Sequence, residues 1–155
     1  EDGKTFEENS QKKAVEIAEF LGMPTISDDS GLCVDYLNGA PGIYSARYSG
    51  ENADDNKNMD KLLADMEGIK ERTASFVSVV SLAKPDGGVY SYRGEAHGEI
   101  MNERHGTNGF GYDPIFFSYE LNKSFGEASA KEKKSVSHRA KAFEKLMKEI
   151  ESIIK

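Results

Sequence analysis

The chain has 155 residues and a formal net charge of −7, with 37% hydrophobic and 30% charged residues. This length favours a single domain, 1–155, and the acidic balance argues against general binding to nucleic acids or anionic membranes, which calls for basic patches. No apolar run approaches the ~18 residues of a membrane span, and the single cysteine, Cys33, suits a reducing cytoplasm. We therefore expect a cytoplasmic protein in which any phosphate ligand needs a bridging cation or nearby lysines.

An amphipathic helix is predicted near the start of the chain. Thr5 followed three residues later by Glu8 forms a capping-box pattern, and Gly22 with Pro24 marks the end of the helix. The apolar residues of this segment recur on one helical face: Phe6, Ala14, Ile17, Ala18 and Leu21. A short strand over 24–27 should follow and lead into a pair of acids.

The segment Ser27–Gly50 reads SDDSGLCVDYLNGAPGIYSARYSG and holds the first candidate site. Two adjacent acids, Asp28 and Asp29, stand at the end of the short strand. Ser30-Gly31 predicts a turn before a second strand begins, and Asn38-Gly39 predicts a further turn because both residues tolerate positive φ. The acids would then lie at a strand end bounded by glycine turns.

Asp28 and Asp29 can be interpreted in two ways. Together with Glu1, Glu7 and Glu8 they could surround a hard cation such as Mg²⁺, which takes oxygen ligands and bridges to substrate phosphates, and a carboxylate near that cation can deprotonate water. Asp before Ser-Gly is also ordinary turn chemistry, because Asp bonds its own backbone. If a strand continues through both acids, their side chains point to opposite faces, so that one faces the site and the other supports it.

The rest of the chain indicates further helices and strands. Asn52 can cap a helix that runs to about Met66, and two β-branched and aromatic stretches, 73–84 and 89–100, predict an antiparallel hairpin. Later segments predict a short strand, a polar loop in which short helical turns can form, and a long amphipathic helix: 114–117, 119–134 and the segment from Ser137. This mixture predicts an α/β fold with a mixed, elongated sheet and flanking helices.

A second candidate site lies in Thr107–Asp113, which reads TNGFGYD. Phe110 stands between Gly109 and Gly111, and a ring with so little crowding can act as a stacking platform for a base, worth ~1–3 kcal/mol. Asp113 follows closely and could accept a hydrogen bond from a purine N1–H. The alternative is that Phe110 fills the core beside a turn.

A third candidate site is Ser137-His138-Arg139, at the start of the last helix. Helix N-termini present free N–H groups that favour anions or carbonyl oxygens. His138 and Arg139 add side-chain donors with no evident structural task, whereas Ser137 is a natural N-cap whatever the function. Lys13, taken alone, would be assigned to the surface.

These three motifs, in this order, resemble the inosine triphosphate pyrophosphatase family, and the resemblance covers nearly the whole chain. It implies hydrolysis of non-standard purine nucleoside triphosphates, namely ITP, dITP and XTP, to the monophosphate and pyrophosphate. It also implies Mg²⁺ as the cofactor, a homodimer, and two lobes around a central cleft that holds the substrate.

The resemblance further implies roles for single residues. Asp29 matches the general base, and the metal ligands match Asp29 and Glu1, which lies just ahead of the GKTFEEN segment. The substrate-binding positions of the family match ten residues. Lys13 matches the helix lysine that faces the phosphates, Ser30 is the residue after the acids, and Lys133 matches a second lysine. The nucleobase motif matches Phe110, Gly111, Tyr112 and Asp113, and the motif that reads the 6-oxo group matches Ser137, His138 and Arg139.

The chain departs from the family pattern at its start. Family members begin with a strand and a phosphate-binding loop of the pattern Ser/Thr-x-Asn-x-x-Lys, and no such segment precedes Glu1. The domain is therefore expected to be truncated at its N-terminus. Two alternatives stay open: a Maf-like nucleotide pyrophosphatase, against which the Ser-His-Arg motif argues, and a nucleotide-binding fragment without catalysis.

Overall fold

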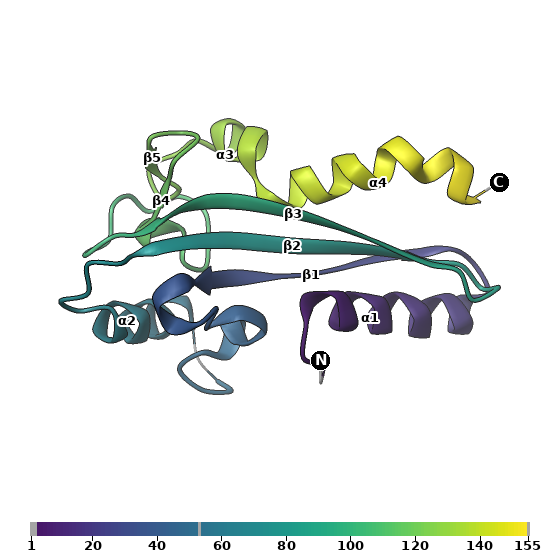
Figure 1. The fold of residues 1–155 in the computed structure, drawn as a ribbon, viewed down its shortest axis with the longest axis horizontal. Helices are drawn as coiled ribbons and strands as arrows, with labels where there is room; N and C mark the ends of the chain where they lie inside the picture. Colours follow the sequence, from purple (N-terminus) through teal and green to yellow (C-terminus); the bar gives the residue numbers. More distant parts are fainter. Residues whose placement is uncertain (1–2, 53, 155) are drawn as a thin grey trace. The chain divides into compact units, whose positions relative to one another are not determined.

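The computed structural model describes residues 3–52 and 54–154, in which helices flank a five-stranded sheet of order β1-β2-β3-β4-β5 (Figure 1). The α-helices and strands, in chain order, are α1 (Phe6–Leu21), β1 (Thr25–Val34), α2 (Asp55–Asp65), β2 (Thr73–Ala83), β3 (Val89–Ile100), β4 (Phe116–Ser118), β5 (Lys123–Ser124), α3 (Ala130–Val136) and α4 (His138–Ile154). Short 3₁₀ helices are η1 (Asp35–Leu37), η2 (Gly42–Arg47) and η3 (Asp113–Ile115). Within the described ranges, no helix is long and apolar enough to cross a membrane.

The predicted α/β class is confirmed, and the sheet is antiparallel where a mixed one was expected. β3 pairs with β4 with Gly98 opposite Ser118, and β4 pairs with β5 with Phe117 opposite Ser124, both antiparallel. Each strand neighbours the one before it in the chain. Hairpins and reversing connections produce this order, whereas a parallel pair needs a crossover.

The chain divides into two compact units, in agreement with the two lobes expected. Unit 1 comprises residues 1–30, 77–95 and 138–155, and unit 2 comprises 31–76 and 96–137. β1, β2 and β3 each contribute residues to both units. The two units are therefore built on segments of the same three strands.

The core of unit 1 forms on both faces of the sheet, because β2 is apolar on both sides. Leu82 packs with α4, whereas the next residue, Ala83, packs with α1. Side chains alternate along a strand, so α1 and α4 cover opposite faces of this part of the sheet (Figure 1). The buried helix residues in these clusters are Ala14 and Ala18 of α1, and Ala142, Leu146 and Ile153 of α4.

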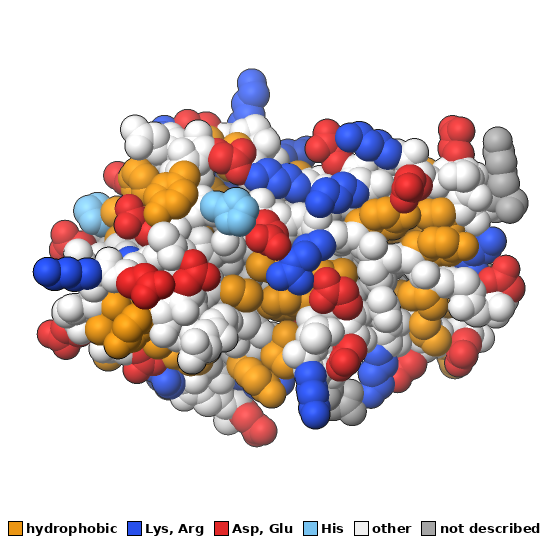
Figure 2. Space-filling view, viewed as in Figure 1, with side chains coloured by type: hydrophobic (Ala, Val, Ile, Leu, Met, Phe, Trp, Pro, Cys, Tyr) orange, Lys and Arg blue, Asp and Glu red, His pale blue; other side chains and the backbone are white. Residues whose placement is uncertain are grey.

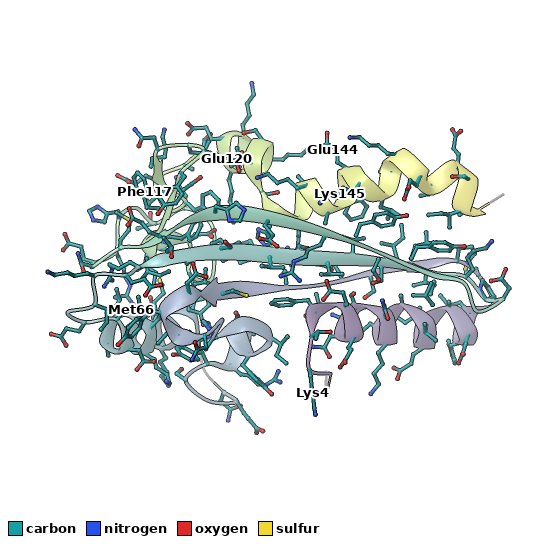
Figure 3. The ribbon with its side chains drawn as sticks, viewed as in Figure 1. Lys4, Met66, Phe117, Glu120, Glu144 and Lys145 are labelled. Atoms are coloured by element: carbon teal, nitrogen blue, oxygen red, sulfur yellow. The ribbon has the colours of Figure 1, made fainter. Side chains whose placement is uncertain are left out.

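The core of unit 2 is built from aromatic rings and from the apolar face of α2. Phe76, Phe116 and Phe125 contact one another with ring centroids 4.6–5.7 Å apart. Leu62 on α2 and Met66, which directly follows α2 and is labelled in Figure 3, are fully buried against this cluster. Burial of such side chains stabilises the unit by roughly 1.5–3 kcal/mol each.

The apolar stripes of α1 and α4 are only partly buried. The predicted face of α1 includes Ile17 and Leu21, and that of α4 includes Phe143 and Met147, yet all four side chains are exposed. Phe20 on α1 is 88% exposed. On α1 the small residues Ala14 and Ala18 face the sheet, whereas on α4 the large side chains of Leu146 and Ile153 are buried together with Ala142. Figure 2 shows apolar side chains interspersed with charges of both signs on the visible face.

The predicted turn at Ser30-Gly31 is wrong, because β1 runs without a break through both residues. Gly31 serves a close approach: a Cβ there would lie 2.3 Å from the Gly42 carbonyl oxygen and 2.7 Å from Ser45 Oγ. The predicted turn at Asn38-Gly39 is confirmed, with φ of 56° and 92°.

Helix boundaries also differ from the prediction. Asp54, not Asn52, caps α2, since its carboxylate accepts from the Lys57 N–H at 2.8 Å. The stretch predicted as a polar loop contains α3, which begins with a capping box between Ser129 and Glu132. Ser-x-x-Glu is itself the signature of such a box, so the sequence carried the signal for α3.

Candidate functional site

Asp29 lies on the α1 face of β1 and is nearly buried, with 9% of its surface exposed. Asn9 of α1 donates from Nδ2 to Asp29 Oδ2 at 3.2 Å. The orientation of the Asn9 amide is fixed because its Oδ1 accepts from the Gly3 N–H at 2.8 Å. Lys13, one turn further along α1, places Nζ 4.0 Å from Asp29 Oδ1. α1 therefore holds Asp29 between an amide and an ammonium group.

Asp28 lies on the opposite face of β1, the face that α4 covers. Arg139, the second residue of α4, donates from Nε to Asp28 Oδ2 at 3.0 Å and from Nη2 to Ser30 Oγ at 3.3 Å. Ser30 is two residues from Asp28 and shares its face. The Asp28 backbone carbonyl accepts from Lys13 Nζ at 2.6 Å. The expectation that the two acids separate, one to each face, is confirmed.

A metal centre made of protein ligands alone is absent from the described residues, which contain no group of three His, Cys, Asp or Glu side chains placed to hold an ion. Mg²⁺ in nucleotide enzymes usually needs only one or two carboxylates, with water and substrate phosphates completing its shell. Asp29 fits this requirement as one carboxylate held in a fixed orientation. Glu1, the other predicted ligand, lies outside the described residues.

The second predicted site lies in unit 2 and is built around the exposed ring of Phe110. Gly109 and Gly111 both have positive φ, 76° and 60°, which curves the backbone tightly on either side of the ring. Phe110 is 62% exposed, so the alternative that it fills the core is wrong. Lys133 places Nζ 4.3 Å from the ring centroid. This distance is that of a cation–π contact. The exposed part of the ring is accessible for stacking with a ligand.

Asp113 is enclosed beneath this loop. Its Oδ2 accepts from the Phe110 N–H at 3.0 Å and from Lys133 Nζ at 2.5 Å. Burial raises the pKa of Asp113, against the opposing effect of the Lys133 ammonium group. Since Oδ2 already has two donors, a purine N1–H would have to reach Oδ1. The structure adds a role that the sequence did not indicate, because Asp113 also shapes the loop that carries Phe110.

Two further contacts hold the same loop and were missed from the sequence. Asp55, the first residue of α2, accepts from the Gly111 N–H at 2.9 Å, and Tyr112 donates from its hydroxyl to the Ser45 carbonyl at 2.6 Å. Asp54-Asp55 reads as an ordinary helix start. A carboxylate with a partner 56 residues away leaves no local pattern, so sequence spacing could not show it.

The predicted residues thus fall into two groups, each within one unit. Unit 1 holds Lys13, Asp29, Ser30, His138 and Arg139, and unit 2 holds Phe110, Gly111, Tyr112, Asp113, Lys133 and Ser137. Ser137 directly precedes α4 in extended backbone, and His138 is the first residue of that helix. In unit 1, Lys13 contacts Asp29 and Arg139 contacts Ser30, and in unit 2, Lys133 contacts both Phe110 and Asp113.

The fold and these two groups define an α/β protein with a carboxylate–lysine cluster in one unit and an aromatic platform in the other. Residues 1–149 match the family model of the Ham1 family. The chain therefore belongs to the Ham1 family.

Two curated relatives match this chain over its whole length. The dITP/XTP pyrophosphatase of Desulfotalea psychrophila is 52% identical over 155 residues, which are 100% of this chain and 70% of the relative. That of Clostridium perfringens is 48% identical, covering 100% of this chain and 80% of the relative. The solved Staphylococcus aureus Ham1 protein superposes with a TM-score of 0.94 at 45% identity, covering 98% of this chain and 79% of that one.

Proposed function

We propose that the chain hydrolyses non-standard purine nucleoside triphosphates, namely dITP, ITP and XTP, to the monophosphate and pyrophosphate. The observation that carries the proposal is the placement of Asp29 against Asn9 and Lys13 in a member of the Ham1 family. Relatives of about 50% identity are named for this activity on dITP and XTP.

Asp29 acts as the general base. Its carboxylate takes a proton from water, whose oxygen then forms a bond to the α-phosphorus while the bond from that phosphorus to the bridging oxygen breaks and pyrophosphate leaves. Asn9 keeps the carboxylate in one orientation, and Lys13 supplies positive charge beside it for the phosphates. Asp29 would hold Mg²⁺, which would supply neutralisation of the charge on the leaving pyrophosphate.

Two features, one within each unit, support recognition of the base. Phe110 supplies an exposed π face, which every purine can use. His138 and Arg139 supply N–H donors suited to the 6-oxo group of hypoxanthine and xanthine, and Arg has no acceptor to offer the amino group of adenine. A site built to bond an oxygen rejects the analogue that lacks it.

The resemblance to the inosine triphosphate pyrophosphatases also supports a cytoplasmic homodimer. Several exposed apolar side chains near the end of α1 leave apolar surface for a second copy: Phe20, Leu21, Met23 and Ile26. Sedimentation equilibrium over a range of concentrations tests the dimer, and a mass that stays at the 17.1 kDa of one chain would contradict it.

The test of the reaction is pyrophosphate release from dITP, XTP and ATP, with and without Mg²⁺, in the wild type and in Asp29→Asn. The amide cannot accept the proton, so we expect kcat for dITP to fall by more than about tenfold, a barrier increase above ~1.4 kcal/mol. Asp86→Asn, at an exposed turn residue, is the matched control and should keep wild-type kcat. Nucleotide binding without any pyrophosphate release would contradict the proposal.

A further inference from the structure

Asp28 forms an ion pair that the proposed reaction does not use. Its Oδ2 accepts from Arg139 Nε at 3.0 Å, and Arg139 Nη2 donates to Ser30 Oγ at 3.3 Å. We propose that Asp28 is a positioning residue for base selectivity: it holds the Arg139 guanidinium group so that its remaining donors meet a 6-oxo group. This inference rests on the proposed function and assigns it a further residue.

The unbroken course of β1 makes this arrangement possible. Strand alternation places Asp28 and Ser30 on the α4 face and Asp29 on the α1 face. The two neighbouring acids therefore have different partners, Asn9 and Lys13 for Asp29 and Arg139 for Asp28. A substitution of the Asp28 side chain can change the arginine while the Asp28 backbone carbonyl, which accepts from Lys13, and the Asp29 side chain stay in place.

The backbone of Arg139 is fixed independently of Asp28. Gly94 on β3 allows the first turn of α4 to lie directly on the sheet, since a Cβ there would be 2.3 Å from the His138 carbonyl oxygen and 2.5 Å from the Ala142 nitrogen. Lys141 Nζ donates to the Glu95 carbonyl at 2.9 Å, and Lys145, labelled in Figure 3, donates to the Arg93 carbonyl. With the helix seated in this way, Asp28 and Ser30 determine where the guanidinium group points.

The chemistry of the guanidinium group connects this position to selectivity. Its five N–H donors lie in a rigid plane, so fixing Nε and one Nη2 hydrogen also fixes the direction of the others. Half of the Arg139 side chain is exposed, 52%, and without the carboxylate it would sample several rotamers in water. The donors would then form a hydrogen bond with the 6-oxo group of dITP less often. Binding of ATP would change little, because its 6-amino group accepts no hydrogen bond from them.

The experiment measures kcat and KM for dITP and for ATP in the wild type, Asp28→Ala, Asp28→Asn, Arg139→Ala and the double variant. We expect Asp28→Ala to raise KM for dITP roughly tenfold, the loss of one charged hydrogen bond, with kcat within about twofold and ATP turnover little changed. Asp28→Asn keeps an acceptor for Nε and should recover part of the selectivity. In the Arg139→Ala background, removal of Asp28 should have no further effect.

The controls separate the two proposals. Asp86→Ala removes an exposed carboxylate near Lys84, also in unit 1, and should leave the dITP/ATP ratio unchanged. A wild type that releases no pyrophosphate from dITP refutes the proposed function, whereas an active wild type with an unchanged or increased ratio in Asp28→Ala refutes this inference alone. If Asp28→Ala does not fold, Asp28→Asn decides, because the amide keeps the size of the side chain but lacks the charge that holds the guanidinium group, and a dITP/ATP ratio equal to that of the wild type would refute this inference.

Discussion

At the scale of single residues, the ion pair between Lys133 and Asp113 is the most deeply buried of the described pairs, with side chains 17% and 3% exposed. Removing one partner of a buried pair leaves an uncompensated charge, which costs about 3–5 kcal/mol. We therefore predict that Lys133→Met lowers the free energy of unfolding by about this amount at pH 8, measured by urea denaturation. Lys123→Met, which breaks the half-exposed pair with Glu132, should cost no more than about 1 kcal/mol.

The cost of Lys133→Met should depend on pH in a defined direction. The pKa of Asp113 is raised by burial above its ordinary value of 3.8. A carboxyl with a raised pKa stabilises the folded state below the unfolded pKa, and this contribution is lost as pH rises through the folded value. Without Lys133 the pKa rises further, so the variant should regain stability as pH falls from 8 towards 4. If the difference in free energy of unfolding between the wild type and Lys133→Met stays constant over this range, the charge of Asp113 is not the cause of the destabilisation.

The sequence singled out the candidate site residues by their chemical type but did not show how they are held. Acids, a ring between glycines and donors at a helix start are visible because their chemistry is local. The partners of Asp113 and Gly111 are not, because Lys133 and Asp55 reach them across 20 and 56 residues of chain. In the sequence, Lys133 looks like any lysine of a helix and Asp55 like any acid at the start of a helix. Composition alone therefore cannot distinguish them from solvated charges.

At the scale of secondary structure elements, Gly31 shows why a correct residue type led to a wrong structural prediction. Glycine before an apolar run indicates a turn, yet here it lets the Gly42 carbonyl and Ser45 approach a continuous strand. In contrast, α1 and the hairpin of β2 and β3 were predictable, because the Thr5 cap of α1 and the turn sequence after β2 agree with the tertiary structure, although only part of the apolar face of α1 is buried. Local propensity cannot show whether a glycine forms a turn or allows the close approach of a segment that is distant in the sequence.

A glycine substitution tests this reading of β1. In Gly31→Ala the new Cβ would lie 2.3 Å from a backbone oxygen, so we predict a loss of about 1–3 kcal/mol in the free energy of unfolding, as for an overpacked core. Gly88→Ala is the control, since its nearest neighbours lie at 3.3 and 3.4 Å and it has no positive φ. Urea denaturation measures both variants, and equal stabilities would mean that β1 and η2 can separate without cost.

At the scale of the whole molecule, three strands run through both compact units. Unfolding of one unit would remove hydrogen-bonded strand residues that continue directly into the other. We therefore predict a single cooperative transition, in which the calorimetric enthalpy of unfolding equals the van't Hoff enthalpy. Leu146→Ala in unit 1 and Leu62→Ala in unit 2 should each lower the midpoint of that one transition. Two separated heat-capacity peaks in either variant would contradict the prediction.

The alternation of side chains along β1 makes this strand sensitive to the parity of insertions. Because Gly31 is held against Gly42 and Ser45, one residue gained or lost between Asp29 and Gly31 would exchange the faces of the two acids, bringing the proposed base to the arginine and its neighbour to the lysine. Two residues gained would restore the faces. Over evolutionary time, changes of length in this strand should therefore survive only in even numbers, whereas the turn between β2 and β3 can change by any number. Because the two acids are adjacent, a shift of one residue exchanges the carboxylate of the proposed reaction with that of the proposed recognition.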